Sequence, residues 1–355
     1  MIRYGNLFSQ IASFENLLLA SRKARRGKRL EQDVMRFEAE VEEELCRLQQ
    51  GLLSKDYVPG AYREFTVWER KRRKISAAPY RDRVIQQALC NVIEPIFEKN
   101  FIFDSYACRR NKGTHRAVER FSRFCRQNQY VLKADILQYF ASIDHAILLE
   151  KIARKVKCPD TLWLVGVIIE GSNPQERRIQ YFPGDDLFTP WERRRGIPIG
   201  NLTSQFFANC YLNDLDHFLK EELGCRHYLR YVDDLAVFGN DKKQLWQIER
   251  KIEDFLAGER LRLHPGKSYV APMAMGIDHL GYRIFPSHRR LRRDSVVAFW
   301  RKVGGLHRQW QAGSIPWQRL NTSLDGWRGH ACHGDTYGLR RKIAEELALP
   351  LGAGL

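Results

Sequence analysis

The chain has 355 residues, of which 44% are hydrophobic, so it is long enough for two or three domains with apolar cores of ordinary size. Lys and Arg number 59 and Asp and Glu 42, and the resulting net charge of +17 predicts a polyanionic partner, which could be RNA, DNA or an acidic membrane. The sequence lacks an apolar run of the ~20 residues that a membrane span needs, and its start does not have the layout of a signal peptide. Its 8 cysteines form no C-x-x-C pair, so we expect a reduced, cytoplasmic setting away from membranes.

Residues 1–60 are predicted to form a helical extension. Ser13 can cap a helix that ends at Gly27. A second helix is expected from about Leu30 to Gln50, because apolar residues recur there at helical spacing. Its acidic residues form either a solvated face or a docking site for a basic partner: Glu38, Glu40, Glu42, Glu43 and Glu44.

Cations cluster at two places in the next segment. A strand is predicted over 62–68, and five consecutive cations follow at 70–74, with Arg81 shortly after them. Such a run at a strand end suits a triphosphate or a nucleic-acid backbone. After a predicted helix at 83–97, the loop 105–115 places cations and a glycine at the start of another helix. The start of a helix can bind an anion, and the candidate residues there are Arg109, Lys112 and His115.

Three acids are candidates for metal binding. Asp233 and Asp234 stand side by side between two runs of β-branched and aromatic residues, which predict a hairpin. Adjacent anions repel each other and a cation relieves the repulsion; the plain alternative is a solvated acidic turn. An earlier apolar strand ends in the third acid, Asp135. Five residues later, Phe140 either packs the core or forms the wall of a nucleotide pocket.

A polar excursion at 171–195 separates these acids, and a glycine-rich turn, Gly196 to Gln205, follows it. The small residues of this turn let a substrate approach the backbone, and a helix is predicted from Ser204 to about Glu222.

Beyond the acidic hairpin we expect a helix at 242–257, a turn that presents Lys267, and a short hairpin at 277–285. From Arg289 onward the chain is predicted to be helical and basic. Its tryptophans suit the packing of a small helical domain or contact with a duplex: Trp300, Trp310, Trp317 and Trp327.

The order of these features, from about Tyr62 to Phe285, resembles the successive motifs of reverse transcriptases. Within that superfamily the chain is similar to the reverse transcriptases of diversity-generating retroelements, which are related to those of group II introns. The similarity is carried by Ile75-Ser76-Ala77-Ala78-Pro79, by Asp104 to Arg109, by Gly113-Thr114-His115 and above all by Ile199-Gly200-Asn201-Leu202-Thr203-Ser204-Gln205. Most reverse transcriptases have Gln before that glycine and Ser-Pro at the end of the loop.

The resemblance implies an α+β fold, a right-hand polymerase with helical fingers, an α/β palm built on an antiparallel sheet, and a small helical thumb. On that basis residues 61–130 would form the fingers, 131–288 the palm with its insertion at 171–195, and 289–355 the thumb.

The resemblance also implies the roles of the candidate residues. Two Mg²⁺ ions would be bound by the three acids and the backbone carbonyl of Ile136, and Lys267 is a candidate proton donor to pyrophosphate. The incoming nucleotide would contact Arg73, Lys74, Arg81, Ile136, Phe140, Ile199, Gly200 and Gln205, with Phe140 excluding a ribose 2′-hydroxyl. Nucleic acid would contact Arg109, Lys112, His115, Tyr231, Gly281 and Tyr282.

The function implied is an RNA-directed DNA polymerase that copies a template-repeat RNA into cDNA with errors at template adenines. Ile199 fits this, because a stiff β-branched side chain cannot make the polar contacts of a glutamine, although it could equally pack the palm. The expected partners are template RNA, the cDNA or primer strand, deoxynucleoside triphosphates and a basic, oligomeric accessory variability protein. The alternatives are an accurate reverse transcriptase of a group II-like or defence element, and an inactive RNA-binding scaffold, which the intact acids argue against.

Overall fold

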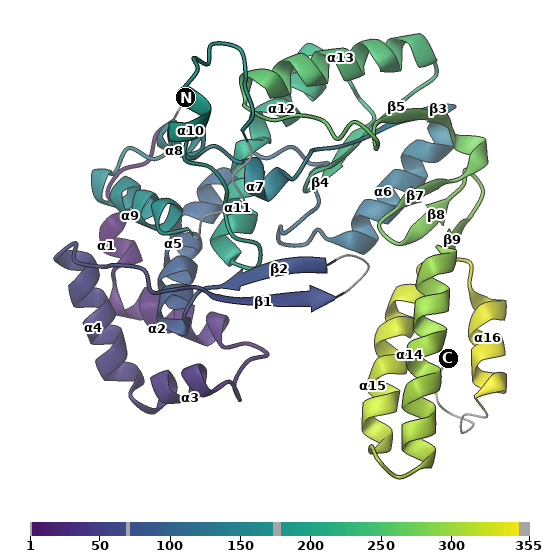
Figure 1. Ribbon diagram of the computed structural model, residues 1–355, viewed down its shortest axis with the longest axis horizontal. Helices are drawn as coiled ribbons and strands as arrows, with labels where there is room; N and C mark the ends of the chain where they lie inside the picture. Colours follow the sequence, from purple (N-terminus) through teal and green to yellow (C-terminus); the bar gives the residue numbers. More distant parts are fainter. Residues whose placement is uncertain (1, 69–71, 173–178, 348–355) are drawn as a thin grey trace.

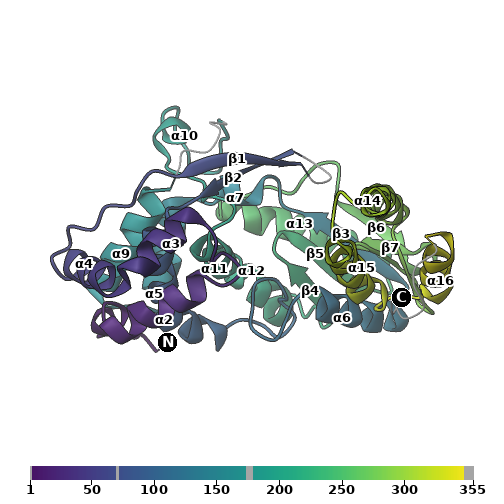
Figure 2. The ribbon, with the colours of Figure 1, turned by 90° about the horizontal axis from the view of Figure 1, so that it is seen from below.

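Figure 1 shows a computed structural model of the protein, which describes residues 2–68, 72–172 and 179–347. Helices and antiparallel sheets are mixed along the chain, so the predicted α+β class is confirmed. The N-terminal helices lie at one end of the molecule, a four-stranded sheet lies in the middle, and a group of three helices lies at the other end (Figures 1 and 2). This is the arrangement of fingers, palm and thumb.

The N-terminal helices pack on the long helix α5 (Tyr80–Glu98) and share its apolar core. The hydroxyl of Ser13 caps the second of them as predicted, because it accepts a hydrogen bond from the backbone N–H of Asn16 at 3.2 Å. These helices are α1 (Phe8–Ile11), α2 (Phe14–Ala24), α3 (Gln32–Ala39) and α4 (Val41–Leu53).

Two predicted helices are wrong in their extent. The helix expected from Leu30 to Gln50 is broken at Glu40, whose φ of −123° and ψ of 36° are not helical. Both halves bury apolar side chains, so the spacing continues across the break and conceals it. The helix expected from Ser204 begins earlier and is divided into α11 (Leu202–Tyr211), α12 (Asn213–His217) and a π-helical turn (Phe218–Glu222).

The central sheet has the strand order β4-β5-β3-β6. These strands are β4 (Tyr228–Tyr231), β5 (Asp234–Gly239), β3 (Tyr130–Asp135) and β6 (Tyr269–Pro272), and the β4–β5 pairing confirms the predicted acidic hairpin. Helix α6 (Thr114–Gln127) lies in the segment assigned to the fingers, but its Phe121 packs on Phe238 of the sheet, with ring centroids 4.8 Å apart. Helix α13 (Lys242–Gly258) packs on the opposite face.

A hairpin of β1 (Arg63–Trp68) and β2 (Arg72–Ala77) extends from the fingers, and in both views it points toward the thumb (Figures 1 and 2). Its base contacts the glycine-rich turn, since the Ser76 amide donates to the Ile199 carbonyl at 3.3 Å. The remaining helices of the palm region are α7 (Tyr139–Ser142), α8 (His145–Ala153), α9 (Pro159–Glu170) and α10 (Thr189–Glu192).

A small antiparallel sheet follows a 3₁₀ turn (Met273–Met275) and joins the segment predicted as palm to the helices predicted as thumb. Its strands are β7 (Ile277–His279), β8 (Tyr282–Ile284) and β9 (Arg289–Leu291). The predicted hairpin at 277–285 is thereby confirmed, and a third strand is added to it. Three helices follow, α14 (Arg293–Gln311), α15 (Trp317–Ala331) and α16 (Tyr337–Glu346). Their core includes Trp327 stacked on Phe299 at 4.3 Å. In the described part of the chain, no helix is both long and apolar enough to cross a membrane.

Candidate active site

The three predicted acids meet at one end of the palm sheet. The antiparallel register of β3 and β5 places Asp135 directly opposite Asp234, so their side chains leave the same face of the sheet. The Ile136 amide donates to the Asp233 carbonyl at 3.3 Å, which fixes the end of β3 beside the acidic turn. Residues almost one hundred positions apart in the sequence are brought together by this pairing.

Two lysines neutralise two of these carboxylates, and a buried histidine contacts one of them. The Lys267 ammonium lies 2.8 Å from Asp135 Oδ1. Lys133, which is buried, pairs with Asp234, and His279 Nδ1 lies 3.2 Å from Asp234 Oδ2. Lys267 was predicted from the sequence as a proton donor to pyrophosphate and not as a partner of Asp135. Lys133 was not predicted, although strand alternation places it on the same face of the sheet as Asp135. Nothing in the sequence indicates the contact of His279.

The acids have different electrostatic environments. Burial, together with the charges of Asp135 and Asp234, raises the pKa of Asp233 to about 6. Burial alone would also raise the pKa of Asp234, but Lys133 and His279 outweigh it and hold this pKa well below its ordinary value. Asp233 is therefore the carboxylate whose ionisation a further cation would stabilise most directly.

The donor chemistry of the site fits Mg²⁺. Carboxylate oxygens are the hard ligands that this ion prefers. Among the described residues, however, no group of three or more His, Cys, Asp or Glu side chains is arranged to hold a metal ion. The ammonium groups of Lys267 and Lys133 lie against carboxylate oxygens that a metal would use, so the predicted metal site requires at least Lys267 to move.

The glycine-rich turn closely approaches the fingers hairpin. Gly200 has a φ of +118°, and a β-carbon there would lie 3.0 Å from Ile75 Cγ2, so both backbone conformation and space favour glycine. The neighbouring Ile199 is 38% exposed rather than buried in the palm, and Gln205 is also exposed. Phe140 is half-buried, and its carbonyl accepts from the Ile197 amide at 2.9 Å.

The cations predicted to bind a triphosphate have separate surroundings. Arg73 lies in β2, but its side chain is outside the described part of the structure. Lys74 pairs with Glu64 at 2.6 Å, and Arg81 pairs with Glu44 of α4 at 3.0 Å. The last contact turns Arg81 toward the N-terminal helices.

The loop cations are engaged within the protein. Arg109 donates to both carboxylate oxygens of Glu98 and to the carbonyls of Ile102 and Ser105, at distances from 2.6 to 3.0 Å. These contacts argue against a role in nucleic-acid binding. Lys112 lies 3.4 Å from the ring centroid of the exposed Phe103.

The palm contacts the thumb through histidines. His115, predicted to contact nucleic acid, stacks on His333 with ring centroids 3.7 Å apart. Tyr282 is buried, and its hydroxyl donates to the His330 carbonyl at 2.6 Å. Gly281 has a φ of +90° beside the same histidine. Tyr231 remains half-exposed near the acids, where its hydroxyl lies 3.1 Å from Thr114 Oγ1.

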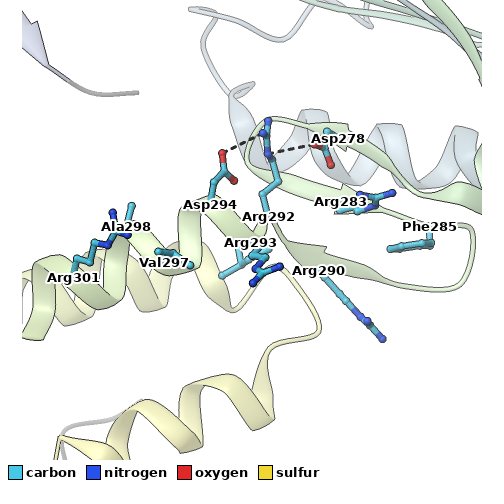
Figure 3. A pocket seen from close by; sticks show the side chains of 11 residues that line it. Asp278, Arg283, Phe285, Arg290, Arg292, Arg293, Asp294, Val297, Ala298 and Arg301 are labelled. Carbon is cyan, nitrogen blue, oxygen red and sulfur yellow. Dashed lines mark hydrogen bonds and ion pairs between the residues drawn. The ribbon is translucent and has the colours of Figure 1, made fainter. Parts of the chain in front are cut away.

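A basic groove of about 830 Å³ lies where the small sheet meets α14 (Figure 3). Arg292 lies between Asp278 and Asp294 in this groove. The other arginines lining it form no ion pair with the described residues, and sequence reasoning did not single them out: Arg283, Arg290, Arg293 and Arg301. Such a groove can bind the phosphates of a nucleic-acid strand.

The sequence matches the family described as reverse transcriptase (RNA-dependent DNA polymerase) over residues 65–284, which is more than half of the chain. The chain therefore belongs to this family, and its enzyme class is RNA-directed DNA polymerase.

Two relatives show where the chain lies within the family. Protein YkfC of Escherichia coli (strain K12) is 23% identical over 302 residues, which cover 74% of this chain and 76% of YkfC. The group II intron-encoded protein LtrA of Lactococcus lactis subsp. cremoris is 24% identical over 221 residues, covering 60% of this chain and 35% of LtrA. The predicted relation to group II intron reverse transcriptases is confirmed, and the aligned part spans about a third of LtrA.

Proposed function

We propose that the protein is the reverse transcriptase of a diversity-generating retroelement, which copies a template-repeat RNA into cDNA by two-metal nucleotidyl transfer. The observation that carries the polymerase chemistry is the register that sets Asp135 opposite Asp234 beside Asp233. The substrates are template RNA, a primer or cDNA strand, and deoxynucleoside triphosphates. The basic groove at the start of α14 supports binding of the template–primer duplex.

In this proposal the three acids and the Ile136 carbonyl hold two Mg²⁺ ions. When bound, these ions would lower the pKa of the primer 3′-hydroxyl and neutralise the triphosphate and its pyrophosphate leaving group. Lys267 pairs with Asp135 at 2.8 Å and so lies beside the proposed metal site, which supports it as the proton donor to the pyrophosphate leaving group. Phe140 and the 196–205 turn line the nucleotide position.

The retroelement subtype rests on the 199–205 loop. Ile199 is exposed at the contact between this loop and β2, so its side chain can meet a nascent base pair. It cannot offer the hydrogen bonds of a glutamine, and looser checking of the pair at template adenines follows.

A basic accessory variability protein is part of this proposal. The acidic side chains of the N-terminal helices give it limited support, because Glu38 contacts Arg25 and Tyr80, and Glu44 contacts Arg47 and Arg81. The acidic surface that remains available to a basic partner is therefore smaller than the sequence suggests.

Primer extension on an RNA template tests the proposed chemistry. We expect Asp233→Ala combined with Asp234→Ala to abolish incorporation of deoxynucleotides, since both carboxylates are lost. Asp254→Asn, at an exposed acid of α13, is the matched control and should extend primers like the wild type. Incorporation that survives the double substitution in folded protein would defeat the metal assignment.

The second candidate is an accurate reverse transcriptase of a group II-like or defence element, which the match to the group II intron-encoded protein LtrA favours. The error spectrum separates the two. Sequenced cDNA with errors concentrated at template adenines supports the retroelement, and uniformly rare errors support the accurate enzyme.

A further inference from the structure

Arg230, directly before the acidic hairpin turn, is a fully buried arginine whose side chain reaches back to that turn. Its guanidinium donates twice to Asp216 of α12, from Nε to Oδ1 at 2.8 Å and from Nη2 to Oδ2 at 2.7 Å. Its Nη1 donates to the Val232 carbonyl at 3.0 Å and to Asn209 Oδ1 of α11 at 3.2 Å. One side chain thus connects two palm helices to the turn that carries the acids.

The turn has a backbone conformation that its sequence does not favour. Val232 has a φ of +57°, whereas the following Asp233 has no positive φ. Tyr231 and Asp234 are paired across this two-residue loop, so the pattern is that of a type II′ turn, which prefers glycine at its first central position. A β-branched residue there is strained by roughly 1–3 kcal/mol, and such strain persists only where the surroundings impose it.

We propose that Arg230 is a positioning residue, which keeps the strained turn and therefore both of its carboxylates in place through the Val232 carbonyl. This inference deepens the proposed polymerase function. It rests on that function in one respect, namely that the turn carries carboxylates of the active site. The contact of Arg230 with the turn is independent of that function.

The Asp216 carboxylate, which holds the Arg230 guanidinium, is itself held in place. Asp216 is fully buried and also accepts from the Tyr228 hydroxyl at 2.7 Å. The backbone of Arg230 is fixed as well, because its N–H donates to the Asp104 carbonyl at 2.9 Å and its carbonyl accepts from the Tyr106 amide at 3.0 Å. The guanidinium is therefore held in a fixed position, and its contact with the Val232 carbonyl holds the turn in place.

Lysine cannot replace arginine here. A guanidinium is planar and carries five donors in a fixed fork, whereas an ammonium group places three donors on one atom. A lysine at 230 can retain the ion pair with Asp216 but cannot at the same time reach Asn209 and the Val232 carbonyl on the other side. Arg230→Lys thus separates the buried charge pair from the contact with the turn.

The test combines Arg230→Lys with Val232→Gly, which removes the strain that the contact offsets. In the otherwise wild-type chain we expect Arg230→Lys to slow primer extension on the order of 10²-fold, the usual cost of a small misplacement of reacting groups. In the Val232→Gly background the same substitution should cost less than about tenfold, because glycine adopts a positive φ without help. Tyr228→Phe, which removes one contact of Asp216 and leaves the contact with the turn in place, should slow extension less than Arg230→Lys does. Asp254→Asn, at an exposed acid of α13, should leave extension unchanged.

Hydrogen exchange tests the contact without reference to catalysis. Amides in peptides spanning 231–236 should exchange faster in Arg230→Lys and return toward the wild-type rate in the double variant, while peptides of α12 stay protected. Asn209→Ala, which removes one of the two acceptors of Nη1, should give the same change in smaller degree and serves if Arg230→Lys does not fold.

The outcomes separate this inference from the proposed function. Unchanged exchange at the turn in both Arg230→Lys and Asn209→Ala overturns the inference, whatever happens to extension. An equal loss of extension with and without Val232→Gly overturns it as well, because the buried pair would then act through general stability. Altered exchange in a protein whose wild type does not extend primers sinks the proposed function and the positioning role together, and leaves only a structural contact.

Discussion

At the scale of single residues, the candidate active site is a set of acids, two of which are paired with side chains from other parts of the chain. Lys267 comes from the turn after α13, whereas Lys133 and His279 come from the palm strand β3 and from β7. Binding of Mg²⁺ to Asp135 must displace Lys267. The third acid, Asp233, has no such neighbour strong enough to offset its burial, and its pKa is raised to about 6.

This raised pKa predicts a pH-dependent response to Mg²⁺. Because the folded state binds a proton on Asp233 more tightly than the unfolded state does, the stability contributed by that proton is lost as pH rises toward about 6. A bound cation relieves the cost of the ionised form. We expect Mg²⁺ to raise the melting temperature more at pH 7.5 than at pH 5, with the difference reduced in Asp233→Asn. Equal shifts at both pH values in the wild type would contradict the role of this acid.

Ile199 is the residue on which the error rate at template adenines is predicted to depend. Ile199→Gln restores a side chain that can hydrogen-bond to a nascent pair, so errors at template adenines should fall several-fold, as when a polar contact is added to a recognition site. The measurement is sequencing of cDNA made on one defined RNA. Leu202→Gln is the control, because Leu202 is also 38% exposed and lies three residues away. Equal adenine error rates for wild type and Ile199→Gln would remove the idea.

At the scale of elements, loops and strands are fixed by buried polar contacts as well as by apolar packing. The loop 101–113 is attached to α5 through Arg109, whose side chain is only 5% exposed. The excursion 179–195 is attached through Arg193, which pairs with Asp185 and, at 3.5 Å, with Asp144. Arg109 therefore stabilises the segment assigned to the fingers, and Arg193 stabilises the insertion in the palm.

The Arg109 contacts predict that substitution of this residue lowers the stability of the fold and does not act directly on RNA binding. Arg109→Ala leaves the Glu98 carboxylate and two carbonyls without their donor and should destabilise the fold by about 3 kcal/mol. Arg110→Ala, at the neighbouring position, should leave the melting temperature unchanged. A loss of RNA affinity in Arg109→Ala without a loss of thermal stability would restore the nucleic-acid role.

At the scale of the whole molecule, the net charge of +17 and the right-hand arrangement both favour binding of a nucleic-acid duplex beside the acids. The β1–β2 hairpin points toward the start of α14, where the basic groove lies (Figure 1). The thumb is also joined to the palm by the stacked pair of His115 and His333. A template–primer duplex would therefore meet cations on more than one side of the acids.

The groove predicts a specific change in salt dependence. Each phosphate contact contributes roughly 0.9 to the slope of log affinity against log salt, so Arg293→Ala combined with Arg301→Ala should flatten the slope by about 2 and weaken duplex binding. Arg341→Ala, in an exposed pair with Glu345 on α16, is the control and should leave the slope nearly unchanged. Filter binding of a template–primer over a range of salt concentrations measures both, and an unchanged slope in the double variant would exclude the groove from the duplex interface.

Most of the helices, the acidic hairpin, the glycine-rich turn and the family could be predicted from the sequence, because these depend on local spacing and on the order of short motifs. The strands β2, β6 and β9 were not predicted, and Arg289–Leu291 lies in a strand where a helix was expected. The fold was needed to show that Glu40 breaks a helix, that Lys133 and His279 contact Asp234, and that Arg109 is directed inward. The same holds for the reach of Arg230 to Val232. Polar partners that lie far apart in the sequence are brought together by strand register and helix packing, and no local sequence pattern records these.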